Sequence, residues 1–87
     1  MFVILVYDVE SKRVGKVMKT VKKYLNPVQK SVFEGFLTES KIEKLKAEIF
    51  KIVNPERDSV IIYKLGSVRF AEKDEIGVIK NDEPHFL

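Results

Sequence analysis

The sequence contains no cysteine, and its only histidine is His85. The absence of cysteine excludes a disulfide framework, a zinc–thiolate site and a cysteine nucleophile. The sequence also lacks a glycine-rich phosphate loop and a Ser/His/Asp arrangement, so nothing indicates those kinds of catalysis. His85 lies in a polar C-terminal segment, where we do not expect it to act as a general base.

Long apolar runs are missing as well. The apolar run at residues 2–7 is much shorter than the roughly 20 residues that a membrane-spanning helix needs. The start of the sequence also has neither the basic lead nor the small-residue cleavage site of a signal peptide. We therefore expect a cytoplasmic protein.

The 87 residues leave room for one domain, residues 1–87. A chain of this size buries only about 60–65% of its unfolded surface, so pairing of two copies would add stability. We expect residues 66–87 to form a C-terminal extension that contributes to such a dimer.

Positive charge is concentrated in one part of the chain. Residues 11–30 contain no acidic residue, whereas the rest of the chain carries a net charge of −4. The basic residues of this segment are Lys12, Arg13, Lys16, Lys19, Lys22, Lys23 and Lys30. Such a local excess is typical of proteins that bind a polyanion, with nucleic acid the favoured partner. A solvated lysine face is the alternative interpretation.

A candidate catalytic residue follows the first apolar run. Residues 2–9 predict a strand that is apolar on both faces, and Asp8 lies at its far end. A carboxylate at this place is held by a rigid strand and is open to water or metal. Asp is also common at strand ends and beside helix N-termini for purely structural reasons.

Two helices and several further strands follow from the pattern. Val14, Val17 and Val21 recur at helical spacing after Ser11, a candidate cap, and a second stripe on this helix is basic. We call this stripe the basic ridge: Lys12, Lys16, Lys19 and Lys23. The remaining predicted elements are a strand at 28–38, a helix from Thr38 or Ser40 to 53, and strands at 58–65, 68–71 and 75–79.

The predicted fold class is α+β, a ferredoxin-like βαββαβ sandwich with an extra C-terminal strand. The strands at 2–9 and 58–65 become the central pair, and we expect them to run parallel. Both are apolar on both faces, yet the two helices cover only one face of the sheet. A homodimer that packs sheet face against sheet face would bury the other one. The alternative is that the C-terminal tail folds back over the sheet.

Three stretches of the sequence resemble one known family. They are residues 7–9 (YDV), Arg13 in the basic helix, and residues 29–35 (QKSVFEG). Together, and over nearly the whole chain, they are similar to the smaller core adaptation protein of CRISPR systems, the CRISPR-associated endoribonuclease family.

This resemblance implies a ferredoxin-like homodimer that partners the CRISPR integrase when new spacers are captured for antiviral defence. Members are described as magnesium-dependent nucleases that cut single-stranded RNA or double-stranded DNA, with the strand-end aspartate as metal ligand. That residue is Asp8 here, and Arg13, Ser31 and Phe33 match other positions near the family's proposed site. Several members act as scaffolds without nuclease chemistry.

A single Asp8 makes a poor site for Mg²⁺ or another divalent cation, which prefers several oxygen ligands in octahedral geometry. Two copies of Asp8, brought together across a dimer axis, would make a plausible one. Glu10 is an outer-shell candidate. We expect Asp58 to be a turn residue at the opposite end of the sheet, since it begins the strand predicted to run parallel to the first.

The residues expected to contact nucleic acid are Lys12, Arg13, Lys16, Lys19, Lys23, Ser31 and Phe33. Each has a structural alternative: a surface position for Arg13, cross-strand pairing for Ser31, and a core or interface position for Phe33. The predicted function is metal-dependent phosphodiester hydrolysis, with Asp8 as the catalytic residue, in a CRISPR adaptation protein. A non-catalytic dimeric scaffold for duplex DNA and integrase subunits is the main alternative, and a small regulatory domain that binds a metabolite is another.

Overall fold

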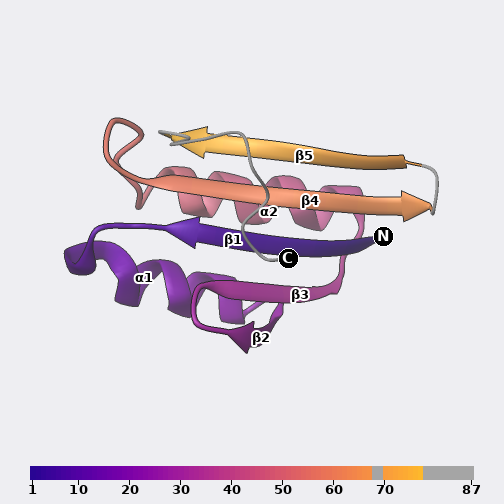
Figure 1. Ribbon diagram of the computed structural model, residues 1–87, viewed down its shortest axis with the longest axis horizontal. Helices are drawn as coiled ribbons and strands as arrows, with labels where there is room; N and C mark the ends of the chain where they lie inside the picture. The colour runs from indigo at the N-terminus through magenta and orange to yellow at the C-terminus, as the bar shows by residue number, and fades with distance from the viewer. Residues whose placement is uncertain (68–69, 78–87) are drawn as a thin grey trace.

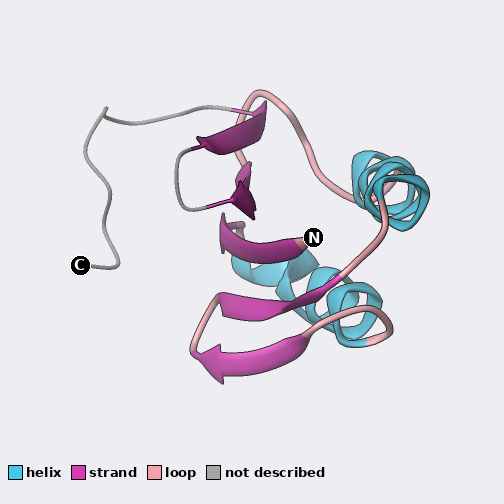
Figure 2. Ribbon diagram, turned by 90° about the vertical axis from the view of Figure 1, so that its right-hand side faces the viewer, coloured by secondary structure: helices cyan, strands magenta, loops and turns pink. Residues whose placement is uncertain are grey.

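The computed structural model describes residues 1–67 and 70–77, which form one five-stranded antiparallel sheet and two helices. The elements are β1 (Phe2–Asp8), α1 (Ser11–Lys22), β2 (Asn26–Gln29), β3 (Val32–Phe36), α2 (Glu39–Phe50), β4 (Ser59–Ser67) and β5 (Phe70–Gly77). The strand order is β2-β3-β1-β4-β5 (Figure 1). Figure 2 shows both helices on the same face of the sheet. The predicted ferredoxin-like fold is confirmed, with β5 as the extra strand.

The core lies between the sheet and the helices. In β1, Val3, Leu5 and Tyr7 are buried and alternate with half-buried residues, as expected for a strand with two unlike faces. Val17 and Val21 of α1 and the α2 stripe Ile42, Leu45 and Ile49 are buried with them. Among the described residues, no helix is long and apolar enough to cross a membrane.

The helix-free face of the sheet is also apolar at its centre. Phe2, Ile4 and Val6 of β1 are half-buried, and so are Ile61 and Tyr63, their neighbours on β4. By strand alternation, all of these side chains project away from the helices. The described part of the chain therefore has an apolar face that neither helix covers.

The predicted strand at 28–38 is two strands. β2 and β3 form a hairpin whose turn is Lys30-Ser31, and Ser31 has a φ of +64°, which is uncommon for a residue other than glycine. The sequence analysis missed this turn because it has neither glycine nor asparagine at the left-handed position. Gly35 in β3 is a site of close approach, because a β-carbon there would lie 3.0 Å from the Leu25 side chain.

Two further expectations for the C-terminal half are corrected. β4 extends to Ser67, beyond the predicted end at residue 65, and the two short strands predicted at 68–71 and 75–79 are replaced by the single strand β5. Residues 68–69 and 78–79 of these predictions lie outside the described part, as does most of the predicted dimer extension at 66–87.

The direction of β4 overturns the expectation for Asp58. β1 and β4 are neighbours, as predicted, but they run antiparallel, and Asp8 is the register partner of Ser59. Asp58 therefore lies at the same end of the sheet as Asp8. The turn at Lys30-Ser31 is the physical reason, since it adds one chain reversal before β4.

The end of β5 packs against the turn that contains Asp58. Gly77 has a φ of +96°, and a methyl group on it would overlap the carbonyl oxygen of Asp58. By contrast, a methyl group on Gly15, which is exposed within α1, would meet nothing within 4 Å.

We predict opposite effects for the two alanine substitutions at these glycines. Gly77→Ala should lower the free energy of unfolding by about 1–3 kcal/mol, because it imposes both backbone strain and a clash. Gly15→Ala should raise it by about 0.5–1 kcal/mol, because alanine is the better helix former. Urea denaturation of the two variants measures both, and equal effects would contradict the assigned backbone geometry.

Candidate functional site

Asp8 lies at the C-terminal end of β1 with an exposed side chain. Strand alternation places it on the same face as Ile4 and Val6, away from the helices. The carboxylate is thus at the edge of the apolar helix-free face, where a second molecule could approach it.

The backbone on both sides of Asp8 is held by hydrogen bonds from other parts of the chain. The N–H of Tyr7 donates to the carbonyl oxygen of Ser31 in the β2–β3 turn at 3.1 Å. The N–H of Glu10 donates to Oδ1 of Asp58 at 3.0 Å. The side chain of Asp8 is therefore exposed, while the main chain on both sides of it is held in place by hydrogen bonds.

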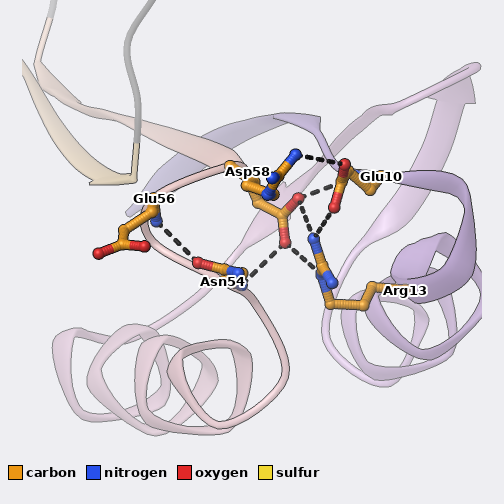
Figure 3. Close-up of polar contacts among 6 residues, drawn as sticks. Glu10, Arg13, Asn54, Glu56 and Asp58 are labelled. Atoms are coloured by element: carbon orange, nitrogen blue, oxygen red, sulfur yellow. Dashed lines mark hydrogen bonds and ion pairs between the residues drawn. The ribbon is translucent and has the colours of Figure 1, made fainter.

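Asp58 is the centre of a buried polar cluster (Figure 3). Its side chain is fully buried, and Arg13 binds both of its oxygens, with Nε 2.6 Å from Oδ2 and Nη2 2.9 Å from Oδ1. The N–H of Asn54 donates to Oδ2 at 2.8 Å. The contact with Arg13 holds the pKa of Asp58 well below its usual range, although burial opposes this shift.

Glu10 extends the cluster to the surface. Its Oε1 accepts a hydrogen bond from Nη2 of Arg13 at 2.6 Å, and Nη1 of Arg57 lies 3.5 Å from Oε2. The bond from Arg13 lowers the pKa of Glu10, and the contact with Asp58, followed by that with Glu10, raises the pKa of Arg13. Arg13, predicted to contact nucleic acid, therefore has two carboxylate partners within its own chain.

Ser31 and Phe33 line an open groove of about 590 Å³ together with Asp8. The groove is lined by Tyr7, Asp8, Val9, Ser11, Val14, Met18, Lys22, Pro27, Gln29, Lys30, Ser31 and Phe33. Only 2% of Phe33 is exposed, and its ring stacks on Tyr7 with centroids 6.0 Å apart. Phe33 is thus a core residue in this conformation, which leaves little of its ring available to a base. Burial raises the pKa of Tyr7, whose hydroxyl is hydrogen-bonded to the Ser31 side chain.

The basic ridge is present on α1. Lys12, Lys16, Lys19 and Lys23 are exposed. Lys23 also contacts α2, because its Nζ lies 2.5 Å from Oε1 of Glu48. Tyr24 donates its hydroxyl to the same carboxylate, and the pKa of Glu48 is lowered mainly by the bond from Lys23. The ridge therefore ends in an ion pair that joins the two helices.

The described residues of one chain do not form a complete metal site. No group of three or more His, Cys, Asp or Glu side chains in this part of the protein could hold a metal ion. Asp58 and Glu10 are engaged by arginine, and Asp8 is the exposed carboxylate at the end of β1. One carboxylate fits Mg²⁺ poorly, so the residues present suit a metal only if two chains share it.

The sequence analysis found Asp8 but missed the cluster around Asp58. Arg13 and Asp58 are 45 positions apart, and only the antiparallel pairing of β1 with β4 brings them together. An arginine in the first turn of a helix was an available signal, because the helix dipole disfavours a cation there unless an anion compensates it.

Comparisons with known proteins identify the family of this chain. Residues 1–73 match the family described as CRISPR associated protein Cas2. The CRISPR-associated endoribonuclease Cas2 of Dictyoglomus turgidum is 46% identical over 87 residues, which is 100% of both chains. The protein of the same name from Thermotoga maritima is 43% identical over 83 residues, 95% of each chain.

Solved structures show the same fold. A crystal structure of cas2 has 38% sequence identity and a TM-score of 0.74, and the match covers 100% of this chain and 98% of that one. The crystal structure of Streptococcus pyogenes Cas2 at pH 6.5 has 33% identity and a TM-score of 0.70, over 76% of this chain and 87% of that one. On the evidence of both its sequence and its fold, the chain belongs to the CRISPR associated protein Cas2 family.

Proposed function

We propose that this protein is a homodimeric nuclease of CRISPR adaptation, which hydrolyses phosphodiester bonds in RNA or duplex DNA with Asp8 as its catalytic residue. The observation that carries the proposal is the position of Asp8, exposed on a hydrogen-bonded main chain at the edge of the apolar face that neither helix covers. The relatives named as endoribonucleases support the activity. In this proposal the nuclease acts together with the CRISPR integrase in spacer acquisition.

The dimer in this proposal follows from the helix-free face. Ile4, Val6 and Ile61 lie at the centre of that face and are half-buried, so their full burial would contribute part of the roughly 1.5–3 kcal/mol that burial of a fully exposed side chain of this kind is worth. Packing of two such faces against each other would bury them without any rearrangement of the helices. It would also bring Asp8 of each chain to the border of the interface, because Asp8 shares this face.

The proposed cofactor is Mg²⁺ or another divalent cation, which when bound polarises the phosphate and lowers the pKa of water. The two copies of Asp8 would hold it, since one chain supplies a single suitable carboxylate. The groove beside Asp8 offers room for the adjoining nucleotide, with Lys22 and Lys30 available to its phosphates and Ser31 on its wall.

A non-catalytic scaffold is the second candidate function. The observation that favours it is the basic ridge, whose lysines are exposed along one face of α1. Such a row of cations suits the backbone of a duplex and carries no sequence preference. In this role the dimer would hold duplex DNA and set the separation of the integrase subunits.

Asp8→Ala tests the nuclease. We expect it to abolish Mg²⁺-dependent cleavage of RNA and duplex DNA while binding remains within about two-fold, because the side chain is exposed and outside the core. Glu56→Ala, an exposed carboxylate in the turn before β4, is the control that should retain full activity. Undiminished cleavage by Asp8→Ala would refute the proposed chemistry, and spacer acquisition by an inactive variant would favour the scaffold.

Ile4→Lys tests the shared site. A lysine at the centre of the helix-free face should convert the dimer to a folded monomer in sedimentation analysis, because its charge would be buried at the interface. Cleavage should disappear with the dimer. Val28→Lys, which replaces an exposed apolar residue on the edge strand β2, should remain dimeric and active. A monomeric Ile4→Lys protein with full activity would sink the idea of a site made by two chains.

A double substitution tests the basic ridge. Lys16→Ala combined with Lys19→Ala should weaken duplex binding and reduce the slope of log K against log salt by about 1.8, since each lost phosphate contact removes about 0.9. The matched control is Lys41→Ala with Lys44→Ala, two exposed lysines of α2. An unchanged salt slope in the ridge variant would show that the duplex binds elsewhere.

A further inference from the structure

We propose that Asp58 is a positioning residue for Asp8, and that it acts through Arg13 and the main chain of Glu10. The inference rests on the proposed function of Asp8 and adds to it the device that holds this residue in place. We call the device the Asp58 clamp: Asp58, Arg13, and the backbone N–H groups of Glu10 and Asn54.

The clamp joins two loops that meet at one end of the sheet. Glu10 belongs to the connection between β1 and α1, and Asn54 and Asp58 belong to the connection between α2 and β4. The carboxylate of Asp58 accepts from the main chain of both loops, at 3.0 Å and 2.8 Å. The side chain of Asp58 therefore bridges the main chains of the two loops (Figure 3).

The hydrogen bond between the Glu10 N–H and Asp58 connects the clamp to the main chain near Asp8. Asp8 is exposed, and Glu10 follows two residues later, after the buried Val9. Upstream, the N–H of Tyr7 is bound by the Ser31 carbonyl at 3.1 Å. Downstream, the bond from the Glu10 N–H to Asp58 is the corresponding tie. Loss of that bond would leave the main chain after Asp8 held by the buried Val9 and the start of α1, without its tie to the loop between α2 and β4.

Arg13 completes the clamp and links it to α1. Its guanidinium binds both oxygens of Asp58 through Nε and Nη2, which fixes the orientation of the carboxylate. The carbonyl oxygen of Glu10 also accepts from the N–H of Arg13 at 2.8 Å, so the first turn of α1 begins at the same residue. A lysine here would keep the charge but could not bind both oxygens in this planar manner.

Burial indicates that the role of the clamp is geometric. Asp58 is fully buried and the Arg13 side chain is 15% exposed. A buried ion pair is often no more stabilising than apolar residues of similar volume. Apolar residues in place of this pair could not accept hydrogen bonds from the main-chain N–H groups of the two loops, as Asp58 does.

The test uses Asp58→Asn and Arg13→Lys in the full-length protein, with turnover, nucleic-acid affinity and amide exchange measured together. We expect kcat for cleavage to fall by about 100-fold, the effect typical of a misplacement of about 1 Å, while Kd for nucleic acid changes less than about two-fold. The amide of Glu10 should exchange with solvent at least ten-fold faster. If Asp58→Asn fails to fold, Arg13→Lys carries the test.

Asp74→Asn is the matched control for a purely structural effect. Asp74 on β5 accepts from Lys46 at 3.1 Å and Lys64 at 3.0 Å, a second partly buried ion cluster located away from Asp8. This variant should lower the melting temperature yet leave kcat unchanged.

Three outcomes would overturn the proposal. One is a folded Asp58→Asn protein with wild-type kcat, another is an equal loss of kcat in Asp74→Asn, and the third is unaltered exchange at Glu10. Retained cleavage by Asp8→Ala would instead remove the proposed function itself, and the positioning role with it. Loss of cleavage in Asp8→Ala but not in Asp58→Asn would overturn the clamp alone.

Discussion

The pairing of Arg13 with Asp58 joins the two halves of this small domain at the end of the sheet where Asp8 lies. Arg13 begins α1 and Asp58 precedes β4, so their contact links the β1–α1 unit to the α2–β4 unit. Asp58 also accepts from the main chain of both loops, and the end of β5 packs against its carbonyl group. Three strands and a helix are thus arranged around one buried carboxylate, whose charge is offset by a single guanidinium.

The two faces of the sheet have different roles. One face packs on α1 and α2 and supplies the core, whereas the other has an apolar centre that neither α1 nor α2 covers. Asp8 follows the strand alternation onto this helix-free face. A domain of this size gains from burial of a further apolar face, and the proposed site needs a second carboxylate. The same pairing of chains would meet both requirements.

The side chains of helix α1 face three different surroundings, because an α-helix has 3.6 residues per turn and successive side chains point in different directions. Val17 and Val21 face the core, Met18 and Lys22 line the groove near Asp8, and the basic ridge faces solvent. A nucleic acid bound along the ridge would therefore lie on the same helix whose first turn is fixed by the Asp58 clamp. Glu48, which pairs with Lys23, ties the other end of this helix to α2.

Local patterns in the sequence determined much of this description. A run of apolar residues predicted β1, and helical spacing predicted the core stripe and ridge of α1. The position of Asp8 at a strand end followed from the apolar run. The turn at Lys30-Ser31 contains no glycine that would indicate it. Because this turn was not predicted from the sequence, β4 was expected to run in the opposite direction. Only the tertiary structure decided that Asp58 lies beside Arg13 and that Phe33 is in the core, because strand pairing joins residues far apart in the chain and leaves no mark on the local sequence.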